Sequence, residues 1–386
     1  MSGLALRGNI VTREEVLENG LLQIEGDSIV AALSREESQN YRGTVLSFEG
    51  HFILPGFIDL HLHGLEGYDF TEHRKEGLLE ISQKLPTFGV TGFLATTLTV
   101  KLETLFTLLD EVAPLSTPPR GARILGIHLE GPHLAPERRG AHDPHLLRKP
   151  CKEEIVHLLK RGGGIVKRIT IAPELEGALE TIEYLAGEGI LVSLGHSTAD
   201  YQTAQEACQR GAKLVTHLFN GMDPLHHRRP NLLAFALESE AIYAEIIADA
   251  VHVSPEILRL AFKCKTPQKI FPVSDAIKVA GLPDGVYPYQ PEEVELKNGK
   301  AELKRTGTLA GSVCLLNRAL LNLKKHVGLS LPELALVGSF LPARLLGIEN
   351  ILGSLEKGKK ADVAVVDEHF TVQATFIAGK KVYERT

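Results

Sequence analysis

Cysteine is scarce in this sequence: four cysteines are spread over 386 residues, and none forms a CxxC pair. Widely separated thiols build neither a disulfide framework nor a thiolate zinc site, so we expect idle or buried thiols in a reducing compartment. The N-terminus lacks a basic region followed by an apolar core and a cleavage site, and no apolar run reaches membrane-spanning length. These absences predict a cytoplasmic protein that does not engage a membrane.

A concentrated basic stripe is also missing. Lys plus Arg number 42 against 48 Asp plus Glu, which gives an evenly spread net charge of −6. Nucleic-acid binders usually carry a basic stripe, so we expect no nucleic-acid partner. The 44% of hydrophobic residues can build a large core, and the length indicates one barrel-sized domain with a smaller companion.

Both ends of the chain have the pattern of short antiparallel strands. Apolar and polar residues alternate from residue 4 to about residue 52, and the same pattern of short strands returns over 353–384. We therefore predict a small β-sandwich domain formed from both termini. The expected division is 1–52 and 351–386 for this domain, with the barrel over 53–350.

The middle of the chain alternates buried strands with amphipathic segments. Amphipathic segments are expected over 75–85, 102–112, 152–160, 178–186, 199–210 and 255–263, and the strands are expected to end near Leu60, Ala95, Leu129, Ala172, Gly195, His217, Ala248 and Ser274. Eight such units indicate an α/β fold of the (β/α)8 TIM-like barrel type. No glycine-rich phosphate loop follows the first strand, so an open doubly wound sheet is not favoured. Helices over 315–326 and 331–346 would close the barrel.

Polar residues able to bind metal fall where these strands end. Two imidazoles two positions apart in a strand share one face, and such a pair makes half of a metal site. Each polar residue alone could be a helix cap or a buried hydrogen-bonding group. Barrel enzymes, however, build their sites at the carboxyl ends of the strands, so the shared location indicates one site. Its candidate members are His61, His63, Glu130, His196, His217 and Asp275.

Histidines together with Glu and Asp suit a divalent ion of borderline hardness. We expect Zn²⁺, with Fe²⁺, Mn²⁺ and Co²⁺ as alternatives. Such an ion activates water and polarises a carbonyl oxygen, and an aspartate on the last strand can exchange the proton. Asp275 fits this acid and base role, although it could instead cap the following helix.

Eight motifs carry a resemblance to a known family. The sequence resembles the N-acetylglucosamine-6-phosphate deacetylases of the amidohydrolase superfamily, in the order and spacing of motifs between about residues 54 and 312. The motifs are PGFIDLHLHG (55–64), HLEGP (128–132), GAH (140–142), GHS (195–197), THLFNGM (216–222), DAVH (249–252), SDA (274–276) and TLAGS (308–312).

The resemblance implies removal of acetate from N-acetylglucosamine 6-phosphate, with Asp275 as the catalytic acid and base. It assigns the principal metal to Glu130, His196 and His217. Members that keep the His-x-His pair can hold a second metal bridged by the glutamate. His61 and His63 are both present here, so the resemblance implies one or two metals per subunit.

The resemblance also implies a sugar pocket. His142 would polarise the acetamide carbonyl or contact the sugar, and His252 would contact the sugar. The remaining lining would come from Ala141, Asn220 and Gly221 and from the backbone of Leu309, Ala310 and Gly311.

A sugar phosphate needs a local cationic partner in a protein of net charge −6. The loop 224–230 carries two histidines and two arginines. By resemblance Arg228 binds the phosphate in a bidentate manner, across the interface of a homodimer. The alternative is a solvated basic loop.

Three positions depart from the family pattern. Arg229 stands where relatives often carry an acidic residue, Gly221 where alanine is common, and Ile277 where a small hydroxyl residue is usual. These departures leave the metal residues untouched. They leave open the exact sugar and the need for phosphate.

Three other functions compete with this prediction. The first is deacetylation of the epimer N-acetylgalactosamine 6-phosphate. The two sugars differ in the orientation of one hydroxyl group, and the sequence does not show which orientation the pocket accepts. Dihydroorotase-like or aminoacylase-like enzymes often use a carboxylated lysine from the fourth strand, but that strand ends here in residues 170–174 without lysine. A barrel without catalytic activity would be expected to have lost a ligand or the base, and this chain keeps them all.

Overall fold

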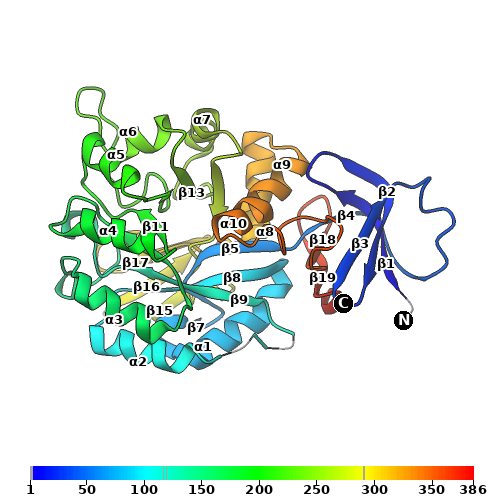
Figure 1. Cartoon of the computed structure of the whole chain (residues 1–386), viewed down its shortest axis with the longest axis horizontal. Coiled ribbons are helices and arrows are strands. Elements are labelled where there is room, and N and C mark those ends of the chain that lie inside the picture. Colours follow the sequence, from blue (N-terminus) through cyan, green and yellow to red (C-terminus); the bar gives the residue numbers. More distant parts are fainter. Residues whose placement is uncertain (1–2, 116, 119, 290–291) are drawn as a thin grey trace.

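The computed structural model describes residues 3–115, 117, 118, 120–289 and 292–386. Figure 1 shows two parts side by side, a barrel surrounded by helices and a smaller β domain that contains both chain ends. Hydrogen bonding arranges the strands in an eight-stranded sheet and a seven-stranded sheet, with two smaller sheets beside them.

The eight-stranded sheet is the predicted barrel. Its strands are parallel and hydrogen-bond in chain order. The first and last strands meet through a parallel bridge between Leu62 and Ala276, and the Asp275 N–H donates to the His61 carbonyl at 2.9 Å. The strands are β5 Phe57–Leu62, β8 Val90–Thr97, β9 Arg123–Glu130, β10 Val166–Ile171, β11 Leu191–Leu194, β12 Leu214–Val215, β13 Tyr243–Ile247 and β14 Ile270–Val273. All eight predicted strands are confirmed.

Helices cover the outside of the barrel and bury apolar side chains against it, in most of them along one stripe. In α2, for example, Leu105, Leu108, Leu109 and Val112 are buried, at spacings of three and four residues. None of the described helices is both long and apolar enough to cross a lipid bilayer. The helices after the strands are α1 Phe70–Lys84, α2 Leu102–Val112, α3 Lys152–Gly162, α4 Ala178–Gly187, α5 Tyr201–Gln209, α6 Leu232–Glu238, α7 Pro255–Lys265 and α8 Leu316–Asn322.

Helix α6 was not predicted, because its sequence LLAFALE is apolar almost all round and shows no periodic stripe. The two closing helices are present but interrupted by wider π turns. The first is α8 followed by η4 Leu323–Val327; the second runs through α9 Leu331–Ala335, η5 Leu336–Phe340 and α10 Leu341–Leu345. Short elements complete the barrel: an antiparallel strand pair, β6 Gly64–Leu65 and β7 Tyr68–Asp69, and three 3-10 helices, η1 Leu85–Phe88, η2 Pro136–Arg138 and η3 Pro144–Leu146.

The seven-stranded sheet confirms the predicted β-sandwich domain from both termini. Its order is β20-β19-β18-β4-β1-β2-β3, so the C-terminal strands continue the N-terminal ones. Side chains from both ends share a separate core that includes Leu6, Ile53 and Phe376. The strands are β1 Leu4–Val11, β2 Val16–Glu25, β3 Ser28–Leu33, β4 Thr44–Pro55, β18 Val363–Val366, β19 Val372–Ile377 and β20 Lys380–Glu384. Strand β4 continues past residue 52, and the division at 52 and 350 stays a prediction.

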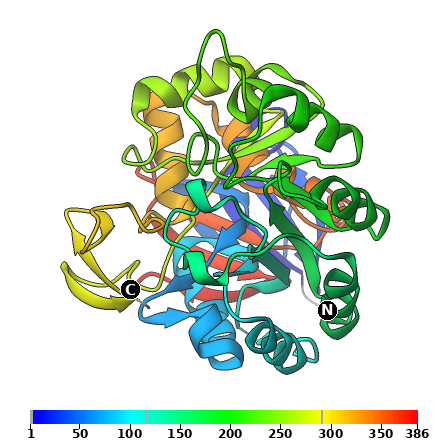
Figure 2. The same cartoon turned by 90° about the vertical axis from the view of Figure 1, so that its left-hand side faces the viewer.

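A third sheet, which the sequence did not predict, lies between β14 and α8. It consists of β15 Gly285–Tyr289, β16 Glu292–Lys297 and β17 Lys300–Leu303, all antiparallel. Figure 2 shows it in yellow, projecting from the side of the barrel. Val294, Leu296 and Tyr289 pack there with Ile277 in a small core of their own. We call this element the insert sheet.

Candidate metal centre

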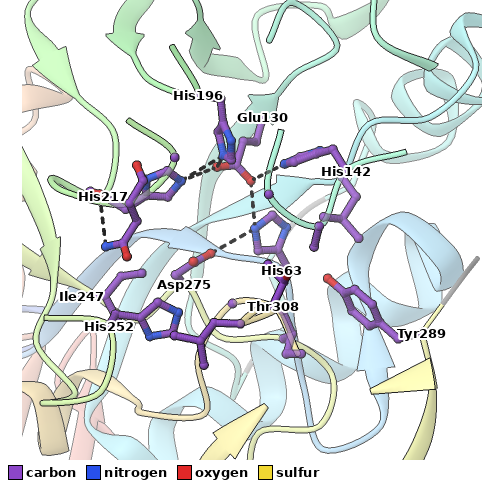
Figure 3. A pocket seen from close by; sticks show the side chains of 18 residues that line it. His63, Glu130, His142, His196, His217, Ile247, His252, Asp275, Tyr289 and Thr308 are labelled. Atoms are coloured by element: carbon purple, nitrogen blue, oxygen red, sulfur yellow. Dashed lines mark hydrogen bonds and ion pairs between the residues drawn. The ribbon is translucent and has the colours of Figure 1, made fainter. Parts of the chain in front are cut away.

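Six predicted residues meet at the carboxyl ends of the barrel strands. His61 lies in β5 with His63 directly after it, and Glu130 ends β9. The other three, His196, His217 and Asp275, follow shortly after β11, β12 and β14. All six are buried, and Figure 3 shows five of them turned toward one another.

The backbone turns sharply at three of these residues. His196, His217 and Asp275 have φ of 48°, 28° and 48°, in the left-handed region that residues other than glycine rarely adopt. Such strain persists where the surrounding structure fixes the chain, and it is common at functional sites. Here it turns side chains from three strand ends inward.

Glu130 is the centre of the group. Its Oε1 lies 3.2 Å from the Nε2 atoms of both His196 and His217 and 3.3 Å from Nε2 of His61. Its Oε2 lies 3.2 Å from Nε2 of His63. One carboxylate therefore contacts both halves of the site, as a bridging ligand would.

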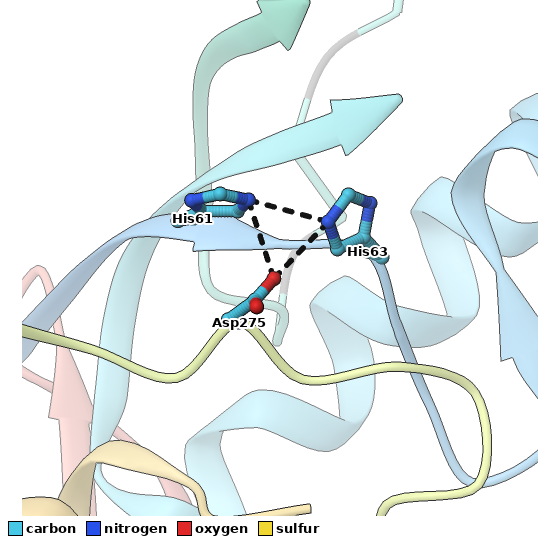
Figure 4. A group of neighbouring side chains, drawn as sticks. All are labelled: His61, His63 and Asp275. Atoms are coloured by element: carbon cyan, nitrogen blue, oxygen red, sulfur yellow. Dashed lines mark hydrogen bonds and ion pairs between the residues drawn. The ribbon is translucent and has the colours of Figure 1, made fainter. Parts of the chain in front are cut away.

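Asp275 completes the half that contains the His-x-His pair. Its Oδ1 lies 3.3 Å from His61 Nε2 and 3.2 Å from His63 Nε2, a triangle drawn in Figure 4. Ligand atoms of these three residues lie within 4.8 Å of one another, close enough to hold one ion.

In three of the four imidazoles, a hydrogen bond at Nδ1 fixes which ring nitrogen faces the site. Nδ1 of His196 donates to the Arg138 carbonyl at 2.7 Å, and Nδ1 of His217 donates to the Asn220 carbonyl at 3.1 Å. Nδ1 of His61 donates to the Glu245 carboxylate at 2.7 Å. Each Nε2 is therefore left with a lone pair, which is the form that ligates a metal.

The Nε2 atoms also lie very close together. The two in His196 and His217 are 3.0 Å apart, and those in His61 and His63 are 3.2 Å apart. Lone pairs that face each other at these distances repel unless a cation or a proton lies between them. The donor set, four imidazoles and two carboxylates, fits one or two divalent ions such as Zn²⁺.

The electrostatics agree with a site built for positive charge. Burial lowers the pKa of His63, but Asp275 and Glu130 more than reverse this and raise it to about 9. Burial raises the pKa of Asp275, while His61 and His63 lower it to about 2. Two carboxylates thus remain charged in a buried site and attract protons or a metal ion.

His142 lies beside this group but carries its hydrogen on the opposite nitrogen. Its Nε2 is 3.4 Å from Glu130 Oε2, and its ligand atom falls within 4.8 Å of those of Glu130 and His196. Its Nδ1 accepts the backbone N–H of Thr99 at 3.3 Å and is 2.8 Å from the Thr99 hydroxyl. An Nδ1 that accepts leaves the hydrogen on Nε2, so His142 presents a donor to the site rather than a lone pair.

A cavity of about 220 Å³ opens over the metal residues. Its wall includes the predicted substrate residues Ala141, His142, Asn220, Gly221, His252, Leu309 and Gly311. His252 is held by Asp249, whose carboxylate accepts from Nδ1 at 2.7 Å. Gly221 has φ of 59°, and a Cβ there would come within 2.9 Å of His196 Nδ1, so the glycine leaves room for this imidazole.

Two predicted residues lie elsewhere. Ala310 is buried, and its N–H donates to the Ala301 carbonyl of the insert sheet at 3.0 Å. This contact anchors the loop in which the adjacent Leu309 and Gly311 line the cavity. Arg228 is exposed and is not among the described residues that line the cavity. Its guanidinium contacts the His227 ring at 2.8 Å.

The cavity also has a wall that the sequence did not predict. Tyr289 comes from the insert sheet, and Figure 3 shows its hydroxyl pointing toward the side of the cavity that holds His63 and His142. Leu98, Ile247 and Thr308 also line it. The strand pattern of 292–297 could have signalled the insert sheet, but nothing in the sequence links it to the mouth of the barrel.

Comparison with known proteins agrees with this geometry. Residues 52–382 match the amidohydrolase family. The N-acetylglucosamine-6-phosphate deacetylase of Bacillus subtilis (strain 168) is 34% identical over 374 residues, which cover 96% of this chain and 94% of the relative. The N-acetylgalactosamine-6-phosphate deacetylase of Escherichia coli O157:H7 is 33% identical over 372 residues, with 96% and 97% covered.

Solved structures give the same result. A mutant N-acetyl-D-glucosamine-6-phosphate deacetylase from Mycobacterium smegmatis, in complex with N-acetyl-D-glucosamine-6-phosphate, superposes with a TM-score of 0.93 at 32% identity, covering 99% of this chain and 100% of that one. The N-acetylglucosamine-6-phosphate deacetylase from Thermotoga maritima superposes with a TM-score of 0.86 at 32% identity, with 98% and 99% covered.

Proposed function

The chain belongs to the N-acetylglucosamine-6-phosphate deacetylase family of amidohydrolases, and we propose that it hydrolyses the acetamide of N-acetylglucosamine 6-phosphate to acetate and glucosamine 6-phosphate. The observation that carries the proposal is the convergence of imidazole Nε2 atoms on Glu130 at the floor of the cavity. This reaction belongs to amino-sugar metabolism, and we expect it in the cytoplasm.

We assign the principal metal to Glu130, His196 and His217, and a second one to His61 and His63, with Glu130 as the ligand that both sites would share. Zn²⁺ is our first choice, with Fe²⁺, Mn²⁺ or Co²⁺ as alternatives, at one or two ions per subunit. A bound ion supplies Lewis-acid activation of water and of the amide carbonyl.

Asp275 handles the proton. Its carboxylate lies at the cavity floor, and contact with two imidazoles keeps its pKa near 2, so it is ionised at neutral pH and carries no proton before the reaction. It takes the proton from the attacking water and returns it to the leaving amine.

His142 acts on the carbonyl. Its Nε2–H points into the cavity, where a donor stabilises the negative charge that develops on the amide oxygen during attack. His252, braced by Asp249, contacts the sugar together with Asn220 and the backbone around Leu309 and Gly311.

The phosphate contact comes from Arg228, and we propose that this residue acts across a homodimer. Within one chain it is exposed, and it lies in a loop with no acidic partner for its guanidinium among the described residues. A second copy that brings this loop to the cavity would give the bidentate cationic contact that a phosphate needs.

N-acetylgalactosamine 6-phosphate is the second candidate substrate. The relative that acts on it is 33% identical to this chain, against 34% for a relative that acts on the gluco epimer. Overall identity therefore favours neither epimer. A carboxylated-lysine amidohydrolase is a weaker alternative, since residues 170–174, at the end of β10, include no lysine.

The test is acetate release from apo-protein reconstituted with measured equivalents of Zn²⁺ or Fe²⁺. N-acetylglucosamine 6-phosphate is run beside its galacto epimer and the phosphate-free sugar. We expect the gluco phosphate to give the highest kcat/KM. In Arg228→Ala the kcat/KM for the gluco phosphate should fall to that for the phosphate-free sugar, while the metal content stays the same. Equal rates on all three substrates would contradict the proposal.

A further inference from the structure

Glu245 lies beneath the metal residues and is used by none of the steps above. It is in β13, and its side chain is completely buried. Its Oε1 accepts from His61 Nδ1 at 2.7 Å and from the backbone N–H of His217 at 3.0 Å. One oxygen atom thus holds a ligand from each half of the candidate metal centre.

The other oxygen of Glu245 is held by a buried cation. Oε2 accepts from Nη1 of Arg168, a fully buried residue of β10. The same guanidinium donates to the Leu60 carbonyl at 3.1 Å, the Thr216 hydroxyl at 3.1 Å and the Ser193 hydroxyl at 3.2 Å. The carboxylate is therefore held directly by His61, His217 and Arg168. The other contacts of the guanidinium keep Arg168 itself in place.

The two contacts made by Oε1 have different consequences. At His61 the carboxylate fixes the hydrogen on Nδ1 and so leaves Nε2 free to ligate. At His217 it holds the N–H of a residue whose φ is 28°, a strained conformation that places the ring beside Glu130. Loss of this acceptor would release both ligands.

We propose that Glu245 is a positioning residue that orients His61 and His217 together, so that the metal affinity of both halves of the centre depends on this one carboxylate. The inference rests on the proposed function, because it requires that these histidines bind metal. It does not require any particular substrate.

The test measures metal binding directly. Full-length protein is stripped with a chelator and dialysed against Zn²⁺ or Co²⁺ of known free concentration, and the bound metal is measured by atomic emission. In Glu245→Gln only one of the two acceptor oxygens remains. The charge of Arg168 favours the orientation in which this oxygen faces the guanidinium. The NH2 group then faces His61 Nδ1 and the His217 N–H, and both lose their acceptor. We expect about 10- to 100-fold weaker metal affinity, typical for loss of a group that orients a metal ligand, and an altered visible spectrum of the Co²⁺ form.

Ser193→Ala is the matched control. It removes one contact of Arg168 but touches neither Glu245 nor a metal ligand. Its metal affinity and Co²⁺ spectrum should equal those of the wild type. An equal loss of metal in Ser193→Ala would mean that any disturbance of the barrel interior weakens the site, and would overturn the inference.

A double variant separates positioning from folding, because Glu245→Gln leaves the Arg168 charge poorly paired. Glu245→Leu with Arg168→Met replaces the ion pair by apolar side chains, an exchange that buried pairs often tolerate. This variant should show wild-type circular dichroism and still bind metal about 10- to 100-fold more weakly.

Unchanged metal affinity in the folded double variant would overturn the role of Glu245 alone. A wild-type protein that takes up no divalent metal would overturn both this inference and the proposed function. The two failures are therefore distinguishable.

Discussion

At the scale of single residues, the hydrogen-bond partner of Nδ1 determines the role of each histidine in the site. A carbonyl or carboxylate behind Nδ1 makes His61, His196 and His217 lone-pair donors at Nε2. A backbone N–H behind Nδ1 makes His142 a hydrogen-bond donor at the same position. Identical side chains thus take opposite chemical roles, which spacing in the sequence cannot distinguish.

Asp275→Asn should keep the fold and the bound metal but lower kcat by about 10² to 10⁴, because the amide cannot take up the proton. Activity is measured as acetate release after metal content has been matched to that of the wild type. A near-normal kcat in the variant would remove Asp275 from the mechanism.

His142→Asn tests the donor assignment. Loss of the Nε2–H should lower kcat by about 10² to 10³, in line with removal of one donor to a developing oxyanion, while the number of bound metal ions stays the same. Metal content by atomic emission and kcat are measured on one preparation. If the variant loses an equivalent of metal, His142 is a ligand and the assignment is wrong.

His133 gives a pH dependence of stability outside the metal centre. Burial lowers its pKa from 6.5 to about 4. Between pH 6.5 and about pH 4, His133 is therefore protonated in the unfolded chain but not in the folded chain. The free energy of unfolding falls as the pH drops through this range. The loss is of the order of 3 kcal/mol.

Urea unfolding at pH 7 and at pH 4.5 checks this. In His133→Gln the stability difference between the two pH values should be smaller than in the wild type, because the variant has no group to protonate there. An identical difference in both proteins would exclude His133 as a source of acid sensitivity.

At the scale of elements, the strand and helix alternation of the barrel was predictable, because each parallel strand is a short apolar run buried on both faces. The six candidate metal and acid-base residues were predicted from their positions at the ends of these strands. The helix α6 was missed, since a uniformly apolar segment has no period. The insert sheet was missed because its three antiparallel strands lie between the last barrel strand and the helix that follows it, outside the regular alternation of strand and helix.

The insert sheet brings Tyr289 to the cavity, and this residue also anchors the sheet's own core. Tyr289→Ala should cost about 3 kcal/mol of stability and raise KM for the sugar phosphate, while Tyr289→Phe keeps the packing and most of the stability. Urea unfolding and steady-state kinetics measure both effects. A Tyr289→Ala protein with unchanged KM would show that the ring does not border the bound sugar.

At the scale of the whole molecule, the two chain ends form one sheet that docks on the barrel. Asp362 lies at the junction, with its carboxylate accepting from Arg123 Nε at 2.6 Å and Nη2 at 2.9 Å and from the Ala378 N–H at 2.7 Å. The sequence predicted that both ends would pair. It could not show this contact, because residues 123 and 362 are far apart in the chain and neither belongs to a motif.

Arg123→Ala should destabilise the protein by about 3 kcal/mol, because it leaves the Asp362 carboxylate buried without its cation. Lys304→Ala is the matched control, since its partner Glu293 is exposed and such surface pairs contribute at most about 1 kcal/mol. Urea unfolding measures both variants. Equal effects would mean that the Arg123 pair does not hold the β domain to the barrel.

The account depends most on a metal ion held by residues from different strand ends, and anomalous X-ray diffraction at the absorption edge of the bound metal tests this most directly. Crystals of the metal-loaded protein should show an anomalous peak bounded by the Glu130 carboxylate and the Nε2 atoms of His196 and His217. A peak bound to other residues, or loaded crystals without a peak at these three side chains, would contradict it.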